Sequence, residues 1–155
     1  MYNRDEELKY LSYIFDRFDK DRDKRLNNKE YEEFMYAISK SADDINCIND
    51  VVINAVFNYY DTDKDDLLTF EDIYIWWIEE KFNKFYIHKN CELIVNAYDI
   101  FKKYAHSKTL SYLQFEQLAI DNNIEYYESA FDTIDADQDG VMNFKEFVVW
   151  LGWFK

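Results

Sequence analysis

The sequence predicts an all-α fold of eight helices, arranged as two lobes that each pair two helix–loop–helix units. Three observations lead to this prediction. The 155 residues include no proline and two glycines, so few residues would interrupt long helices. Apolar residues recur at helical spacing along most of the chain. Acidic twelve-residue segments stand between these apolar stretches, which indicates a repeated unit.

The first unit is centred on the segment DKDRDKRLNNKE, Asp19–Glu30. Apolar residues of 8–18 predict its entering helix, and those of 31–38 predict its exiting helix. Carboxylates at alternate positions face the inside of a coiled loop, where a hard cation such as Ca²⁺ takes six to eight oxygen ligands. The predicted ligands are the carboxylates of positions 1, 3, 5 and 12 and the backbone carbonyl of position 7: Asp19, Asp21, Asp23, Glu30 and Arg25.

Two features weaken the first loop as a cation site. Lys24 stands at position 6, where the turn requires a positive φ that costs a residue other than glycine about 1 kcal/mol. Lys20, Arg22 and Arg25 also lower the negative potential of the loop.

The second unit is centred on DTDKDDLLTFED, Asp61–Asp72, with predicted helices over 48–60 and 70–82. Asp66 takes the turn position, which aspartate tolerates better than most residues. The acid at position 12 is one methylene shorter than glutamate, and ligation through one oxygen suits six-coordinate Mg²⁺ better than Ca²⁺. The predicted ligands follow the same schedule: Asp61, Asp63, Asp65, Asp72 and the carbonyl of Leu67.

The third loop lacks acidic ligands. If Leu110 takes position 8 and Gln114 takes position 12, the loop starts at Lys103. If the loop is instead aligned by the apolar residues of its entering helix, it starts at Lys102 and has thirteen residues. Neither choice places a carboxylate at a ligand position, so we predict that this loop binds no ion. Its flanking helices are predicted over 91–104 and 115–119. His106 in this loop, and His88 before it, are predicted to be surface residues.

The fourth loop, DADQDGVMNFKE, matches the schedule at each key position. Gly140 provides the positive-φ turn, and Asn143 at position 9 is placed to hold a water. Helices are predicted over 126–134 and 144–154. The predicted ligands are Asp135, Asp137, Asp139, Glu146 and the carbonyl of Val141.

These loops carry a resemblance to a known family. The pattern D-x-[DN]-x-[DN]-G-x5-E is typical of EF-hand calcium loops. The whole chain resembles a four-EF-hand protein of the calmodulin superfamily. The stretch from Leu110 to Phe154 is similar to the C-terminal half of sarcoplasmic calcium-binding proteins. That resemblance implies paired hands, short β-pairing between loops, and a calcium and magnesium buffer. Those proteins more often lose the second or fourth site, whereas here the third is lost.

Composition limits the class of partner and the compartment. A net charge of −14 argues against nucleic acid and against electrostatic attachment to an anionic membrane. We expect no secretory leader and no membrane anchor, and reduced thiols at Cys47 and Cys91, which together favour the cytoplasm. The connections 40–46 and 83–90 separate predicted helices, and the border of the lobes is placed between residues 84 and 85. No spacing typical of a nucleophile and its base is present, so an enzyme is not predicted.

Two roles follow from about three bound Ca²⁺ ions per chain, with Mg²⁺ as an alternative at the second loop. A Ca²⁺/Mg²⁺ buffer or signal modulator fits the apolar faces, which carry Tyr, Phe and Trp rather than Met. The alternative is a calcium sensor that exposes an apolar groove and binds a helix of a protein target. A light-emitting photoprotein is a third class that such aromatic bodies resemble, although no residue singles out a chromophore cavity.

Overall fold

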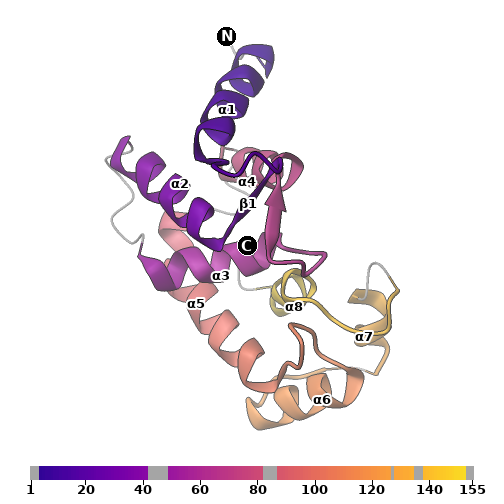
Figure 1. The fold of residues 1–155 in the computed structure, drawn as a ribbon. Coiled ribbons are helices and arrows are strands. Elements are labelled where there is room, and N and C mark those ends of the chain that lie inside the picture. The colour runs from indigo at the N-terminus through magenta and orange to yellow at the C-terminus, as the bar shows by residue number, and fades with distance from the viewer. Residues whose placement is uncertain (1–3, 42–48, 82–86, 127, 135–137, 153–155) are drawn as a thin grey trace. The chain divides into compact units, whose positions relative to one another are not determined.

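The computed structural model describes residues 4–41, 49–81, 87–126, 128–134 and 138–152. Within these ranges the chain forms eight helices and two short strands (Figure 1). The order is α1 (Arg4–Phe18), β1 (Arg25–Asn27), α2 (Asn28–Ser41), α3 (Asp50–Tyr60), β2 (Leu67–Thr69), α4 (Phe70–Lys81), α5 (Ile87–Tyr104), α6 (Tyr112–Asp121), α7 (Glu128–Ile134) and α8 (Phe144–Leu151). The predominantly helical class predicted from the sequence is confirmed.

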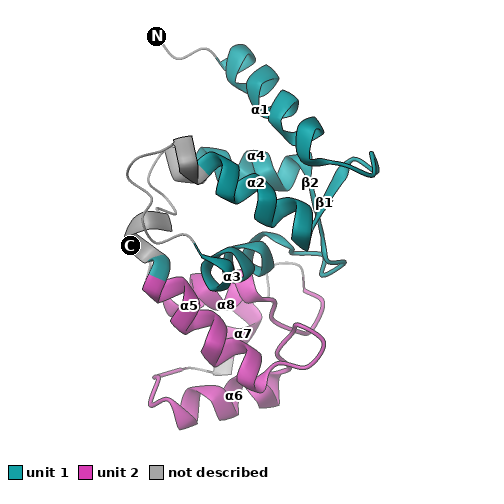
Figure 2. Cartoon of the chain, turned by 60° about the vertical axis from the view of Figure 1, so that its left-hand side comes forward, with its two compact units in different colours: residues 1–91 teal, residues 92–155 magenta. Residues whose placement is uncertain are grey.

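The chain divides into two units, residues 1–91 and 92–155 (Figure 2). The boundary lies inside α5, seven residues after the predicted border at 84, and Ile87–Asn90 are helical. Those four residues were predicted to belong to a connection, and that prediction is wrong. None of the helices in the described ranges is both long and apolar enough to cross a membrane.

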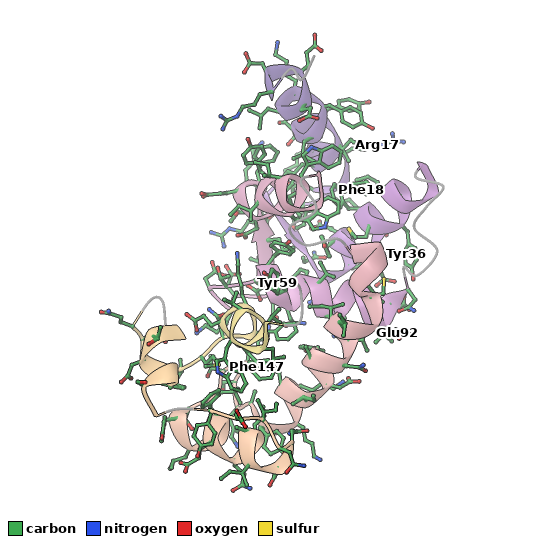
Figure 3. The ribbon with its side chains drawn as sticks, turned by 180° about the vertical axis from the view of Figure 1, so that it is seen from behind. Arg17, Phe18, Tyr36, Tyr59, Glu92 and Phe147 are labelled. Atoms are coloured by element: carbon green, nitrogen blue, oxygen red, sulfur yellow. The ribbon has the colours of Figure 1, made fainter. Side chains whose placement is uncertain are left out.

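Unit 1 has an aromatic core between its helices. The rings of Tyr31 and Phe57 lie 5.5 Å apart, and those of Phe34 and Trp76 lie 5.9 Å apart, both edge to face. Phe18, at the end of α1, has its ring 5.9 Å from that of Phe34 (Figure 3). The side chains with no exposed surface come from both strands and from each of α1 to α4: Leu11, Leu26, Tyr31, Phe34, Ala55, Val56, Phe57, Leu68 and Ile73.

Unit 2 repeats this construction with other aromatic residues. The ring of Phe115 lies 4.6 Å from that of Trp150 and 5.7 Å from that of Phe131. Phe147 of α8 has its ring 5.5 Å from that of Phe101 of α5 (Figure 3). These contacts join the four helices of the unit around one core. Helix α8 is buried on one side only, since Phe147 has no exposed surface whereas Val149 is 64% exposed.

Local capping explains where several helices begin. The side chain of Asn49 accepts a hydrogen bond from Val52 N at 3.0 Å at the start of α3. Ser111 and Gln114 form a reciprocal capping box at the start of α6, three residues before the predicted start at 115. Helix α8 ends at Gly152, whose φ of 64° is typical of a glycine that terminates a helix.

The structure corrects the prediction of reduced thiols for the one cysteine among the described residues. The side chain of Cys91 is 7% exposed and disulfide-bonded. Cys47 lies outside the described residues. A reducing compartment therefore has no support from the described cysteine.

Candidate metal centres

The first acidic loop gathers three carboxylates. One oxygen each from Asp19, Asp21 and Asp23 lie within 4.8 Å of one another. Asp19 follows α1 directly, and its backbone N–H donates to Phe15 O at 3.0 Å, so the helix end fixes its position. Like charges this close repel each other, and a bound cation would relieve that repulsion. The sequence predicted this grouping.

Backbone N–H groups hold the loop in its coiled shape. Lys24 N donates to Oδ2 of Asp19 at 3.0 Å, and Arg25 N donates to Oδ1 of Asp23 at 2.9 Å. Lys24 has a φ of 68°, which confirms the positive φ predicted at position 6. Arg22 at position 4 has a φ of 59°, a second strained position that the sequence did not reveal.

Asp19 has one carboxylate oxygen that no hydrogen bond satisfies. The residue is 4% exposed, and its Oδ1 is buried without a hydrogen-bond donor. A buried charged oxygen without a partner costs free energy, and such atoms are rare in folded proteins. A divalent cation between the three carboxylates would provide the missing partner.

Glu30 lies at the other side of the loop, in the first turn of α2. Its Oε1 accepts from Lys20 N at 3.2 Å and its Oε2 accepts from Asn27 N at 3.0 Å, while Asn27 Oδ1 accepts from Glu30 N at 2.9 Å. The side chain is therefore turned back over the loop and is 5% exposed. Glu30 does not join the group of oxygens that Asp19, Asp21 and Asp23 form, and its two oxygens are engaged by backbone N–H groups.

The second loop repeats the hydrogen bonds that the carboxylates at positions 1 and 5 accept in the first loop. Oxygens of Asp61, Asp63 and Asp65 lie within 4.8 Å of one another, and Asp61 is 3% exposed. Asp66 N donates to Oδ2 of Asp61 at 3.1 Å, as Lys24 N does to Asp19. Burial alone would raise the pKa of Asp63, but hydrogen bonds with Asp65 and Asp61 outweigh it and lower that pKa.

Asp72 differs from Glu30 in the way its side chain is held. Its Oδ2 accepts from both the backbone N of Thr69 at 2.9 Å and the hydroxyl of Thr69 at 3.1 Å. Burial raises the pKa of Asp72, and the bonds from Thr69 oppose this rise only in part. The shorter side chain is thus half-buried at the start of α4, with Oδ2 engaged by Thr69.

A two-stranded antiparallel sheet joins the first two loops. Its register pairs Arg25 with Thr69, Leu26 with Leu68 and Asn27 with Leu67. Leu26 and Leu68, both at position 8, have no exposed surface. The β-pairing predicted between loops is present here, and in unit 2 Leu110 pairs with Met142 in the same way.

The third loop is shorter than either predicted version. Helix α5 continues through Lys103 and Tyr104, and Ala105 N donates to Phe101 O at 2.9 Å. Counted from the residue after α5 to Gln114 at position 12, the third loop has ten residues, whereas the first loop, counted in the same way from Asp19 to Glu30, has twelve.

A tight hairpin turn replaces the cation loop at this point. His106 N donates to Thr109 O at 2.9 Å and Thr109 N donates to His106 O at 3.1 Å. Ser107 and Lys108, between them, have φ of 51° and 67°, which is the geometry of a two-residue hairpin turn. His106 is exposed, as predicted, whereas the surroundings of His88 lie outside the described side chains.

The fourth loop is described in part. Asp135 and Asp137 lie outside the described residues. Asp139 Oδ1 accepts from Val141 N at 3.0 Å, and Gly140 has a φ of 81°. A Cβ on Gly140 would meet no atom within 4 Å. Glycine is therefore favoured here by the positive φ and not by a lack of space for a side chain.

The start of α8 repeats the arrangement at the end of the first loop. Asn143 N donates to Oε2 of Glu146 at 2.9 Å, and Glu146 N donates to Oδ1 of Asn143 at 2.9 Å. Glu146 is 8% exposed. Position 9 and position 12 therefore form a reciprocal cap in this loop, as Asn27 and Glu30 do in the first.

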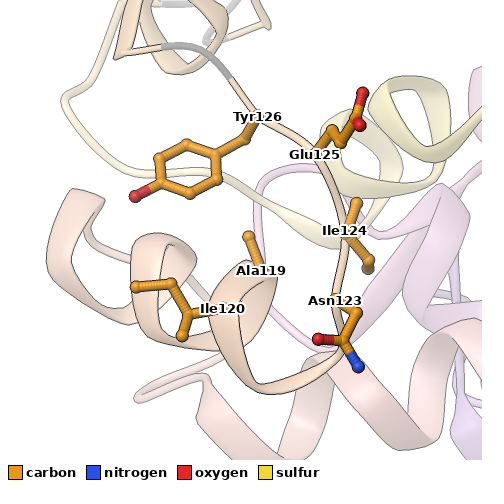
Figure 4. Close-up of a pocket in the computed structure, with 6 residues that line it drawn as sticks. All are labelled: Ala119, Ile120, Asn123, Ile124, Glu125 and Tyr126. Atoms are coloured by element: carbon orange, nitrogen blue, oxygen red, sulfur yellow. The ribbon is translucent and has the colours of Figure 1, made fainter.

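A separate hollow of about 500 Å³ lies where α6 ends, in unit 2 (Figure 4). Its lining combines apolar side chains with one amide, one carboxylate and one phenol. The phenol of Tyr126 donates to Oε1 of Glu116 at 3.1 Å. The lining contains no nucleophile paired with a base: it consists of Ala119, Ile120, Asn123, Ile124, Glu125 and Tyr126.

Comparison with known proteins adds no family: no family model matches the chain, and no curated protein matches it.

Proposed function

We propose that this chain is an EF-hand calcium-binding protein that acts as a Ca²⁺/Mg²⁺ buffer or signal modulator. One observation carries the proposal above all others. Asp19 buries a carboxylate oxygen that has no hydrogen-bond partner, at the centre of three carboxylates whose oxygens lie within 4.8 Å of one another. A bound cation would neutralise these carboxylates and would give the buried oxygen of Asp19 a partner.

The proposed ion sites are three. The first two are Asp19–Glu30 and Asp61–Asp72, which share the same backbone hydrogen bonds at positions 1 and 6. The third is Asp135–Glu146, where the glycine turn and the reciprocal cap of Asn143 and Glu146 support the proposal. The segment from Ala105 to Gln114 offers no carboxylate and is proposed to bind no ion.

A buffer is favoured over a sensor by the packing inside unit 1. Phe34 and Phe57 have no exposed surface, and their rings pack on those of Trp76 and Tyr31 in the same unit. A sensor must present such a surface to its target after Ca²⁺ binds. The proposed function includes no catalytic step, no nucleic-acid partner and no membrane anchor.

The sensor alternative has one observation in its favour. Tyr10 and Tyr13 are 56% and 66% exposed, and their spacing of three residues places them on the same face of α1. Exposed aromatic side chains that share a face are typical of sites that bind a protein partner. The partner in that case would be an apolar surface of another protein.

Dye binding with and without Ca²⁺ separates the two roles. A dye that fluoresces on apolar surface is mixed with the full chain in chelator and then in saturating Ca²⁺. A buffer gives nearly the same signal in both conditions. A large rise with Ca²⁺, abolished by Tyr10→Ser with Tyr13→Ser, would replace the buffer with the sensor. Leu113→Ser with Ile120→Ser is the matched control, because it removes two exposed apolar side chains from α6 and leaves α1 unchanged.

A further inference from the structure

A cation of the first loop contacts a carboxylate of the second. Arg25 Nη1 donates to Oδ2 of Asp65 at 3.4 Å, across 40 residues of sequence. Asp65 is position 5 of the second loop and one of the three carboxylates that gather there. The guanidinium therefore lies beside a group that would bind the ion.

The strand pairing places Arg25 there. Arg25 is the first residue of β1 and pairs with Thr69, so its side chain is carried to the edge of the neighbouring loop. Leu26 and Leu68, the next pair, are fully buried and hold the two strands together. The contact is thus a consequence of the register between the loops rather than of proximity in sequence.

We propose that Arg25 is a built-in competing cation for the second loop. This inference rests on the proposed function, namely that Asp61–Asp72 binds a divalent cation. An ion ligated by Asp65 lies about 2.0–2.6 Å from the carboxylate oxygen, and Arg25 already contacts the same carboxylate. The two positive charges repel each other, so ion binding requires Arg25 to move away.

The exposure of the pair decides how strong the competition is. The side chains of Arg25 and Asp65 are 48% and 35% exposed, so Arg25 can swing into solvent and salt screens the contact. We therefore expect a lowered affinity, not a blocked site. The effect of Arg25 also differs from that of Asp72. Arg25 lowers the affinity for Ca²⁺ and for Mg²⁺ alike, because both ions carry two charges. The length of the Asp72 side chain instead changes the preference between the two ions.

Arg22 provides a matched control within the same loop. It carries the same charge at an exposed position, and Arg22→Gln changes the net charge by the same amount as Arg25→Gln. Both variants keep the backbone carbonyls unchanged. Any difference between them reports the contact with Asp65 rather than the general field of the loop.

The experiment isolates the second loop in the full chain. Glu30→Gln and Glu146→Gln together disable the other two proposed sites, and Arg25→Gln or Arg22→Gln is then added. Calorimetric titrations with Ca²⁺ and with Mg²⁺ are run at low and high salt. Arg25→Gln should bind both ions roughly 3- to 10-fold more tightly at low salt, with a smaller gain at high salt, and Arg22→Gln should change affinity less than about 2-fold.

The same pair of variants is also measured in the otherwise unchanged chain. There the titration step that disappears in Asp65→Asn identifies the second loop, and Arg25→Gln should tighten that step. Equal effects of Arg25→Gln and Arg22→Gln, or no effect of either, would overturn the inference while leaving the proposed function intact. If the second loop bound neither ion in any variant, the proposed function of that loop would fail as well.

Discussion

The two carboxylate oxygens of Asp19 are in different situations, and the contrast explains the first loop. Oδ2 accepts a hydrogen bond from the backbone N–H of Lys24, and Oδ1 is buried without a donor. The loop shape is thus fixed by hydrogen bonds, while one oxygen stays available to a ligand. A loop that only formed a surface turn would have no reason to bury that oxygen.

Lys24 should cost the folded chain stability because its φ of 68° is already present in the structure. We predict that Lys24→Gly is about 0.5–1 kcal/mol more stable to unfolding than Lys24→Gln, because both remove the charge but only glycine removes the left-handed strain. Denaturant unfolding in excess chelator measures the difference. Equal stability of the two variants would show that strain at position 24 is negligible.

Asp72 should set the ion preference of the second loop. We predict that Asp72→Glu raises Ca²⁺ affinity there by on the order of tenfold relative to Mg²⁺, because the longer side chain can ligate with both oxygens. Competitive titration of the two ions measures the ratio. The reverse change, Glu30→Asp in the first loop, should move that loop toward Mg²⁺; if neither ratio moved, side-chain length at position 12 would not govern selectivity.

At the scale of elements, the connection after α5 is a hairpin turn rather than a cation loop. Ser107 has a φ of 51°, an angle that asparagine adopts more readily than serine and that a β-branched residue resists. We predict that Ser107→Asn is more stable to thermal unfolding than Ser107→Thr, by on the order of 1 kcal/mol. Both should bind the same number of ions as the parent chain, and a changed ion count would contradict the assignment of this turn.

A second element-scale contact joins α2 to the start of α3. The phenol of Tyr36 donates a hydrogen bond to Asp50, which raises the pKa of Tyr36 from 10.0 to about 12. A pKa that is higher in the folded chain than in the unfolded chain means that the folded chain favours the protonated phenol. The contact therefore contributes fully below pH 10 and is lost as the pH rises through about 12.

Ultraviolet titration of the phenols tests this contact. Tyr36→Phe should remove one phenol that ionises at high pH and should leave the remaining titration unchanged. Asp50→Asn keeps the phenol and should lower its pKa, because the carboxylate that stabilises the neutral form is gone. A titration curve that Asp50→Asn does not alter would show that the contact is absent in solution.

At the scale of the whole molecule, net charge links ion binding to stability. The chain carries −14, and three Ca²⁺ ions would add six charges and bring it to −8. We predict three bound ions at saturating Ca²⁺ and a higher melting temperature in Ca²⁺ than in chelator, because binding favours the folded chain and relieves carboxylate repulsion. Native mass spectrometry and thermal scans measure both. A count of one or four, or an unchanged melting temperature, would contradict this prediction.

The sequence by itself determined the helical class and where carboxylates gather in the first two loops. The helical class, the groups Asp19–Asp23 and Asp61–Asp65, and the positive φ at Lys24, Asp66 and Gly140 followed from residue spacing. These features are local. Period, turn geometry and alternate ligand spacing all act over a few neighbouring residues, which is the range that a single sequence encodes directly.

Tertiary structure alone decided the remaining features, because each depends on residues that are distant in sequence. The pairing of Leu110 with Met142 fixes the end of the third loop, while the continuation of α5 fixes its start, and together they leave ten residues. The register of β1 with β2 brings Arg25 to Asp65. The disulfide at Cys91 likewise depends on a partner in space. Residue spacing along the chain does not show which distant residues will meet, because that depends on which surfaces the fold brings together.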